Sequence, residues 1–195
     1  MRTIDILQAI KERRSTFSFS PEEVDLQMLK EIFTYGSWAP THYMKESWNI
    51  KLYQGEGKKS FVDAIIASYQ RIGMLKGDDD PKTVKMIDSM KQFLLEIPHH
   101  ALIFFEKNQD LIRYEEEYSS VCAFIQNSQL AAWSYGVGML WTITPYMHDP
   151  GFAHDIGLDS EKVKIAAVMQ IGYPKQTSRN KGRTSIEEKL EIISE

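Results

Sequence analysis

Two arginines followed by two hydroxyl residues are the first group in the chain with the chemistry of a binding site. Arg13, Arg14, Ser15 and Thr16 stand just past the end of an amphipathic segment. Guanidinium groups and hydroxyls suit the oxygens of a phosphate group. The arginines could instead stabilise the dipole of the preceding helix, an effect worth less than about 1 kcal/mol. Spacing alone favours this second interpretation without excluding the first.

Other patterns with catalytic potential are incomplete. The five histidines, at positions 42, 99, 100, 148 and 154, include no pair with metalloprotease spacing, and Cys-x-x-Cys does not occur, so we expect no metal site. Gly57-Lys58-Lys59-Ser60 lacks the upstream glycines of a phosphate-binding loop. Gly136-Val137-Gly138 lacks the third glycine of the dinucleotide-binding fingerprint. Cys122 lies in an apolar segment, which disfavours the thiolate that a nucleophile needs.

The composition is that of a soluble globular chain. Hydrophobic residues make up 43% of its 195 residues, and 27 acidic against 23 basic residues give a net charge of −4, which disfavours nucleic acid as a partner. No apolar run is long enough to predict a membrane span. Because the chain has one cysteine and no signal-peptide pattern, we expect a cytoplasmic protein. One domain, residues 1–195, suits this length.

The longest apolar stretch, from Glu115 to Thr144, predicts a core helix that leads into a core strand. Apolar residues fall on nearly every side of the helix, so most of its sides must be covered. Gly136-Val137-Gly138 ends the helix, because glycine readily adopts left-handed backbone. Residues 139–143 then read as a buried strand. The tryptophans at positions 38, 48, 133 and 141 are interpreted as core aromatics.

Helices and strands are mixed along the rest of the chain. A first helix is predicted from Ile4 to about Arg13, with Ile6, Leu7 and Ile10 facing inward, and a second helix ends at Pro40. Further helices are predicted at 58–75, 81–96 and 150–157. Either Ser20 or Asp25 can cap the second helix. Strands are predicted at 48–53, 101–105 and 164–172, and the residues after Ser185 fit either a helix or a strand. This order predicts an α+β fold with a central mixed or antiparallel sheet of four to five strands flanked by helices.

Five segments stand out in order along the chain: Arg13-Arg14-Ser15, Trp38-Ala39-Pro40-Thr41-His42, Trp48, Gly136-Val137-Gly138-Met139-Leu140-Trp141 and Ile171-Gly172-Tyr173-Pro174. Together they resemble the small-subunit branch of the nitroreductase family of FMN-dependent NAD(P)H oxidoreductases. The resemblance extends from about Ile4 to Arg183 and is weakest between Lys58 and Pro98. It implies an intertwined α+β homodimer with two FMN molecules at the subunit interface.

The resemblance also implies which residues bind FMN. Five would hold its phosphate and ribityl chain: Arg13, Arg14, Ser15, Lys181 and Arg183. This implication reverses the preference stated above for the arginine pair. His42 would reach the flavin from the other subunit, although its irregular segment would otherwise indicate a surface histidine. Four residues would pass the isoalloxazine ring: Trp141, Thr142, Ile143 and Thr144. No side chain is assigned as a catalytic acid or base, since the flavin carries the chemistry.

The implied activity is ping-pong hydride transfer. NAD(P)H would reduce the flavin at N5, and a nitroaromatic, quinone or related small electrophilic acceptor would then be reduced. Residues 58–98 would form a variable helical cover of the acceptor pocket, and residues 175–195 would pack on the partner subunit. Met44 and Glu46-Ser47 replace the Asn and Gln-Pro of many members, and Phe17 replaces a lysine that some carry beside the flavin. Two alternatives remain: an FMN carrier or sensor without efficient turnover, and an interaction module that binds no FMN.

Overall fold

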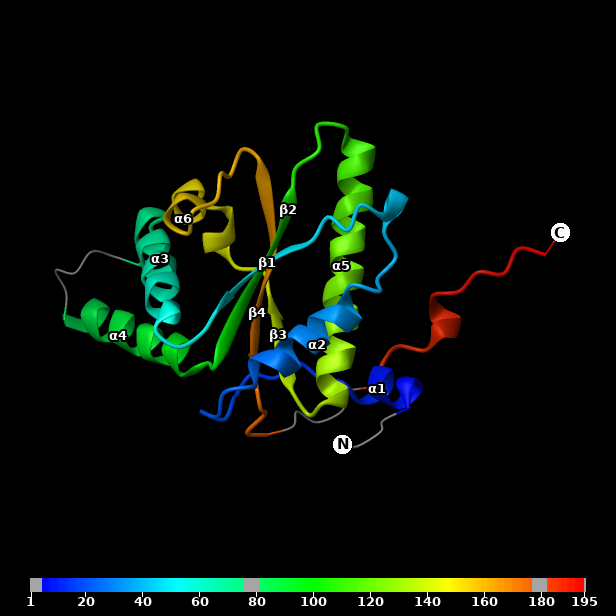
Figure 1. The fold of residues 1–195 in the computed structure, drawn as a ribbon, viewed down its shortest axis with the longest axis horizontal. Helices are drawn as coiled ribbons and strands as arrows, with labels where there is room; N and C mark the ends of the chain where they lie inside the picture. Colours follow the sequence, from blue (N-terminus) through cyan, green and yellow to red (C-terminus); the bar gives the residue numbers. More distant parts are fainter. Residues whose placement is uncertain (1–4, 76–80, 177–181, 195) are drawn as a thin grey trace.

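A central antiparallel sheet carries helices on both of its faces (Figure 1). The computed structural model describes residues 5–75, 81–176 and 182–194. Its helices are α1 (Ile6–Glu12), α2 (Leu26–Gly36), α3 (Gly57–Arg71), α4 (Pro81–Glu96), α5 (Leu111–Ser134) and α6 (Pro150–Asp155). Its strands are β1 (Asn49–Tyr53), β2 (His99–Glu106), β3 (Gly138–Thr142) and β4 (Val163–Gly172).

The sheet has the order β1-β2-β4-β3, and each neighbouring pair is antiparallel. In the described residues, the predicted sheet is therefore confirmed with four strands, all antiparallel. The inner strands β2 and β4 are buried along most of their length, because helices cover both faces. β1 and β3 form the edges. The register places Trp141 of β3 opposite Met169 of β4.

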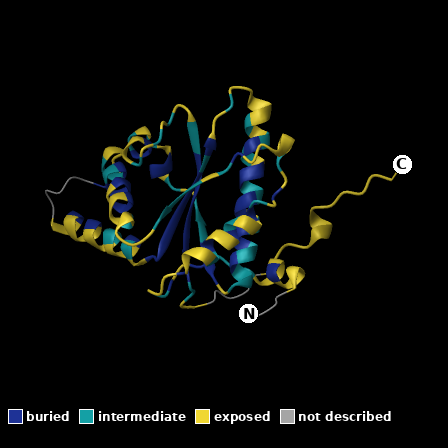
Figure 2. Cartoon of the chain, in the orientation of Figure 1, coloured by how far each residue is buried: buried dark blue, intermediate teal, exposed yellow. Residues whose placement is uncertain are grey.

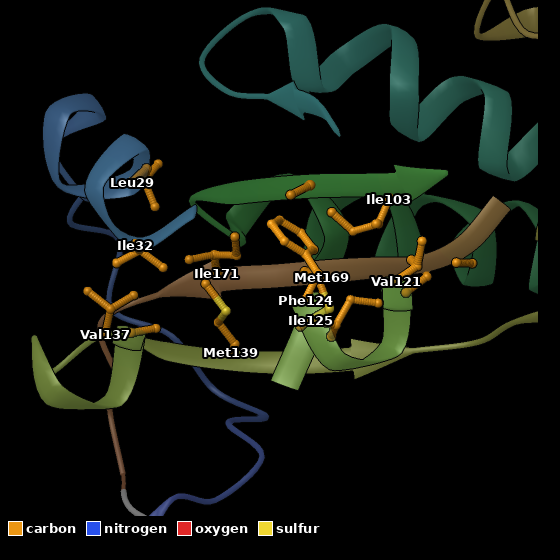
Figure 3. Packing of buried hydrophobic residues seen from close by; sticks show 14 of the residues in the cluster. Leu29, Ile32, Ile103, Val121, Phe124, Ile125, Val137, Met139, Met169 and Ile171 are labelled. Atoms are coloured by element: carbon orange, nitrogen blue, oxygen red, sulfur yellow. The ribbon is translucent and has the colours of Figure 1, made fainter. Parts of the chain in front are cut away.

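Helices α2 and α5 cover one face of the sheet. Figure 3 shows Val121 and Phe124 of α5 packed with Leu29 of α2 and Met169 of β4 in one apolar cluster. Gly36 allows the two helices to approach closely, since a Cβ at that position would lie 2.1 Å from Ser128 Oγ. On the other face, α3, α4 and α6 enclose a second apolar cluster. That cluster includes Phe61, Ile65, Leu94, Phe152 and Val168.

The predicted helices and strands are present, with adjusted ends. Asp25, not Ser20, caps α2, because its carboxylate accepts the N–H groups of Gln27 and Met28. α5 begins at Leu111, earlier than predicted, where Asp110 provides the cap. The residues after Ser185 form neither of the predicted alternatives: they contain one 3-10 turn, Ile186–Glu188, in otherwise irregular backbone. Within the described residues, none of the helices combines the length and apolarity needed to cross a membrane.

Three predictions about burial are wrong for this chain. Ile6, Leu7 and Ile10 were expected to face inward, yet they are 58%, 70% and 54% exposed, and Ala9 is the buried residue of α1. Trp38, expected in the core, is 82% exposed. Cys122, expected inside a buried helix, is half-buried. Figure 2 shows that exposed residues cover α1 and the C-terminal segment, residues 182–194. The apolar residues predicted on α1 and at Trp38 are present, but no other part of the described chain packs over them.

Candidate functional site

Residues 13–16 lie against the start of the edge strand β3. Ser15 and Met139 form a parallel bridge, and the Thr16 N–H donates to the Met139 carbonyl oxygen at 3.2 Å. Gly138 makes this approach possible, because a Cβ at that position would lie 2.3 Å from Thr16 Oγ1. The segment that follows α1 is thereby fixed at the edge of the sheet, and its arginines are fixed with it.

Three arginines influence one another at this edge. Arg14 Nη1 donates to the carbonyl oxygens of Lys11 and Arg13 at 2.7 and 2.6 Å. The Nε atoms of Arg13 and Arg14 are buried, with no hydrogen-bond partner in the described part of the chain. Burial, followed by the charges of Arg14 and Arg183, lowers the pKa of Arg13. Buried donors and mutually repelling cations suit an anion with several acceptor oxygens.

The predicted phosphate-binding residues are thus partly brought together. Arg13, Arg14 and Ser15 are adjacent in the chain, and Arg183 lies close enough for its charge to act on Arg13. Lys181, the fifth predicted residue, lies outside the described residues. A phosphate dianion fits this donor set, because it would neutralise the arginines and accept from their buried N–H groups.

The residues from Trp141 to Thr144 lie at the opposite end of β3. Trp141 is half-buried, and its Nε1 has no hydrogen-bond partner in the described residues. Thr142 Oγ1 donates across the sheet to the Val168 carbonyl oxygen at 2.7 Å. Ile143 is 58% exposed, and both Ile143 and Thr144 line a cavity of about 570 Å³.

Sequence reasoning did not identify the other walls of this cavity. They are formed by Ile72, Pro145, His148, Asp149 and Pro150. Ile72 caps the C-terminal end of α3, and the others join β3 to α6. Arg71 stiffens the wall, because its guanidinium group pairs with the carboxylates of Asp149 and Asp155, each at 2.9 Å. The only hint of this wall was an exposed apolar residue, Ile72, at the end of α3, but single exposed isoleucines are common in proteins and do not indicate a cavity.

His42 lies near the opposite end of α5 from the arginines. Its Nδ1 is 3.8 Å from Glu116 Oε1, and its side chain is 51% exposed. The arginines follow α1, which packs on the C-terminal end of α5 (Figure 1). About 27 Å of helix separates Glu116 from Ser134, at about 1.5 Å per residue. Within one chain, therefore, the structure does not bring His42 together with Arg13.

Known proteins resemble this chain in both sequence and fold. Residues 10–173 match the sequence pattern of the Nitroreductase family. YfhC of Bacillus subtilis (strain 168), whose name assigns it provisionally to the NAD(P)H nitroreductases, is 26% identical over 182 residues, covering 93% of this chain and 90% of YfhC. The crystal structure of a nitroreductase-like family protein from Bacillus cereus has a TM-score of 0.89 and 33% identity, covering 100% of this chain and 99% of that one.

A more distant relative shares the fold. The FMN-dependent nitroreductase NfnB from Mycobacterium smegmatis, solved in complex with NADPH, has a TM-score of 0.73 at 16% identity and covers 97% and 100% of the two chains. The four-stranded antiparallel sheet between helical layers is thus the α+β fold that this chain shares with nitroreductases. The chain belongs to the nitroreductase family, and it is an oxidoreductase of that family.

Proposed function

We propose that this protein binds FMN and uses NAD(P)H to reduce a small electrophilic acceptor such as a nitroaromatic or a quinone. The observation that carries the proposal is the cluster of Arg13, Arg14 and Arg183 near the start of β3, in which the Nε atoms of Arg13 and Arg14 are buried without a hydrogen-bond partner in the described residues. The relative NfnB, named as FMN-dependent and solved with NADPH, supports the choice of cofactor and of hydride donor.

The two ends of β3 suit the two ends of FMN. Arg13, Arg14, Ser15 and Arg183, together with Lys181, would hold the phosphate and ribityl chain. From Met139, which bridges Ser15, to Thr142, the last residue of β3, the strand spans about 10 Å, at about 3.3 Å per residue. This length is comparable with the separation between the phosphate and the ring of an extended FMN. Residues 141–144 would then lie beside the isoalloxazine ring.

The protein would supply position and electrostatics. Bound FMN would supply the redox chemistry, the transfer of a hydride from NAD(P)H to the acceptor. The arginines would neutralise the phosphate. The largely apolar cavity of Ile72, Ile143 and Pro145 would accommodate a planar acceptor. Residues 58–98 would cover it from the side of Ile72, which follows α3. We assign no side chain as acid or base, and the proton that the acceptor takes up with the hydride would come from water.

We further propose that the active form is a homodimer. Exposed apolar side chains lie on α1, around Trp38 and on the C-terminal segment, including Ile186, Leu190, Ile192 and Ile193. Exposed apolar surface of this kind marks interaction sites. Residues 175–195 would pack on the partner. Because His42 lies far from the arginines of its own chain, it would contribute to the flavin site of the partner.

The visible spectrum of the flavin tests the proposed function. FMN is titrated into the purified protein, and NADH or NADPH is then added without oxygen. We expect about one FMN per subunit, loss of the flavin absorption band on adding the reductant, and its return on adding a quinone or a nitroaromatic. A protein that binds FMN but keeps its band would favour the carrier or sensor, which the replacements at Met44 and Glu46 motivate. A protein that binds no FMN would favour the interaction module.

A further inference from the structure

The segment that joins α2 to β1 has strained backbone directly after His42. Tyr43, Met44 and Glu46 have φ angles of 49°, 54° and 48°, in the left-handed region that residues other than glycine seldom adopt. Such backbone persists only where surrounding contacts determine it, and it is concentrated at functional sites. Some contact must therefore hold residues 42–46 in this shape.

Packing beneath the segment does not provide that contact. A cavity of about 500 Å³ lies between the segment and the N-terminal half of α5, with Thr41, His42 and Lys45 in its wall. Tyr43 and Met44 are 91% and 76% exposed, so their side chains are not held by the core. The shape of the segment depends instead on polar contacts.

One of these contacts reaches a buried charge. Lys45 Nζ donates to Oε1 of Glu117, a residue of α5 whose side chain is only 7% exposed. Asn108 Nδ2 donates to the same oxygen at 3.1 Å. By comparison, the contact between His42 and Glu116 is longer, at 3.8 Å, and joins two side chains that are 51% and 36% exposed. A buried carboxylate needs a cation beside it, which makes the Lys45–Glu117 pair the stronger constraint.

Backbone hydrogen bonds pass this constraint on to His42. The Lys45 N–H donates to the His42 carbonyl oxygen at 3.1 Å, and the Glu46 N–H donates to Thr41 Oγ1 at 3.0 Å. Residues 41–46 therefore form a closed turn with His42 on one side and Lys45 on the other. Fixing Lys45 on α5 fixes the direction in which the His42 ring is presented.

We propose that Lys45 and Glu117 form a latch that positions His42 for the flavin of the partner subunit. Both are positioning residues, which act through His42 and are not themselves placed at the phosphate or the ring. The proposal rests on the proposed function, because it assigns His42 to the partner's FMN. It also explains why a charged pair sits beneath a strained turn: the pair holds a backbone shape that local preference disfavours.

Amide hydrogen exchange on the full-length protein without FMN tests the latch itself. We compare Glu117→Gln and Lys45→Met with Lys91→Met, which removes an exposed lysine–carboxylate pair, Lys91 to Asp63 at 2.9 Å, between α4 and α3. In the two latch variants, the amides of Lys45 and Glu46 should exchange at least about 10-fold faster, because local opening becomes easier. The control should match the wild type. Unchanged exchange in both latch variants would overturn the proposal.

The double variant K45M/E117Q separates positioning from general loss of stability. It leaves no buried charge unpaired, so its unfolding midpoint should return towards that of the wild type. The exchange of residues 45 and 46 should nevertheless stay fast, because the latch is absent. Exchange that returned to the wild-type rate together with the unfolding midpoint would show that the pair serves stability alone, which would contradict the proposal.

A double-mutant cycle that combines Glu117→Gln with His42→Ala tests whether the latch acts through His42. FMN affinity, measured by quenching of flavin fluorescence, should fall about 10-fold on Glu117→Gln in the wild type but less than about 2-fold in the His42→Ala background. Lys45→Arg should keep most of the affinity. An equal loss in both backgrounds would overturn the role assigned to His42. If the wild type binds no FMN, the proposed function fails, while the exchange experiment still decides the latch.

Discussion

Arg13 and Arg183 reach the same edge of the sheet from opposite ends of the chain. Burial, and then repulsion from the guanidinium groups of Arg14 and Arg183, lowers the pKa of Arg13, so the folded chain holds this charge at an energetic cost. An anion that neutralises them stabilises the folded state by binding it selectively. The cluster is thus better explained by a ligand than by the dipole of the short helix α1. Stabilising that dipole would not require Arg183, which comes from a distant segment of the chain.

Removing either arginine should weaken FMN binding. For Arg13→Ala and Arg183→Ala we expect a loss of about 2 kcal/mol each, about 30-fold in affinity, the scale of one charged hydrogen-bond partner. Lys162→Ala, which removes an exposed cation paired with Asp159, is the control and should have no effect. Fluorescence titration with FMN measures the change. Wild-type affinity in both arginine variants would rule out the phosphate assignment.

His100 gives the fold a defined sensitivity to acid. Its ring is 1% exposed, and its Nε2 lies 2.9 Å from the Leu94 carbonyl oxygen. Burial lowers its pKa from 6.5 to about 4. As the pH falls, the unfolded chain is therefore protonated first. The stability contributed by the neutral ring is complete above about pH 6.5 and is lost as the pH falls to about 4, a difference of about 3 kcal/mol.

Urea unfolding of the wild type and of His100→Gln, at neutral pH and near pH 4.5, measures this effect. Glutamine can still donate to Leu94 but does not titrate, so the variant should lose less stability between the two conditions. His99, whose pKa burial also lowers, will keep part of the acid sensitivity in both proteins. Equal losses in wild type and variant would contradict the assignment to His100.

At the scale of elements, β3 connects the arginine cluster with the apolar cavity, and Gly138 sets where residues 13–16 meet it. In Gly138→Ala the new Cβ would lie 2.3 Å from Thr16 Oγ1 and 2.8 Å from Thr16 Cβ. We expect a loss of about 1–3 kcal/mol in the free energy of unfolding, as for other overpacked sites. FMN binding should also weaken, because the arginine segment is displaced.

Gly57→Ala is the matched control for this change. Gly57 begins α3, and a Cβ there would meet no atom within 4 Å. The substitution should therefore be neutral or stabilise the protein by up to about 1 kcal/mol. Chemical denaturation compares the two variants. Equal stability of Gly138→Ala and the wild type would show that the segment and the strand are not in close contact.

The elements were predictable because each has a strong local pattern. β2 and β4 are continuous apolar runs, as expected for strands covered on both faces, and α3 and α4 carry apolar residues on one side. The bridge between Ser15 and Met139 has no local signal, because it pairs residues far apart in the chain. The spacing of Ile6, Leu7 and Ile10 marks an apolar face, but spacing does not reveal whether the same chain covers it.

The candidate site was predictable only in part. Family resemblance predicted Arg13, Ser15 and Arg183 as phosphate-binding residues, and the structure places Arg183 close enough for its charge to act on Arg13. The resemblance could not reveal the cavity wall at Ile72 and His148, since that wall is formed by segments that meet only in the folded chain. The left-handed backbone of residues 43, 44 and 46 was also missed, because Tyr, Met and Glu do not favour it.

At the scale of the whole molecule, large apolar side chains are exposed at both ends of the described chain. Ile6, Leu7 and Ile10 of α1, Trp38 and the isoleucines of the C-terminal segment are all more than half exposed (Figure 2). A second copy of the chain would cover them. The proposed homodimer would also account for the distance of His42 from Arg13 along α5, because each chain would complete the flavin site of the other.

We expect the two subunits to bury an apolar interface above about 2,000 Å². Light scattering at micromolar concentration should therefore give about twice the chain mass of 22.6 kDa. Ile10→Asp would place a charge in that interface and should shift the protein towards monomer, with weaker FMN binding. Met86→Asp, at an exposed apolar position of α4, should leave the mass unchanged. A wild-type monomer that carries FMN would contradict the proposed assembly.

A mixed dimer tests the shared flavin site most directly. One subunit carries Arg13→Ala and the other His42→Ala, the pair is purified by two different affinity tags, and FMN is titrated into it. If each site takes its arginines from one chain and its histidine from the other, one site contains both substitutions and the other contains neither. The titration should then show about one FMN bound with wild-type affinity per mixed dimer. Two equally weakened sites would contradict a flavin site built from both subunits.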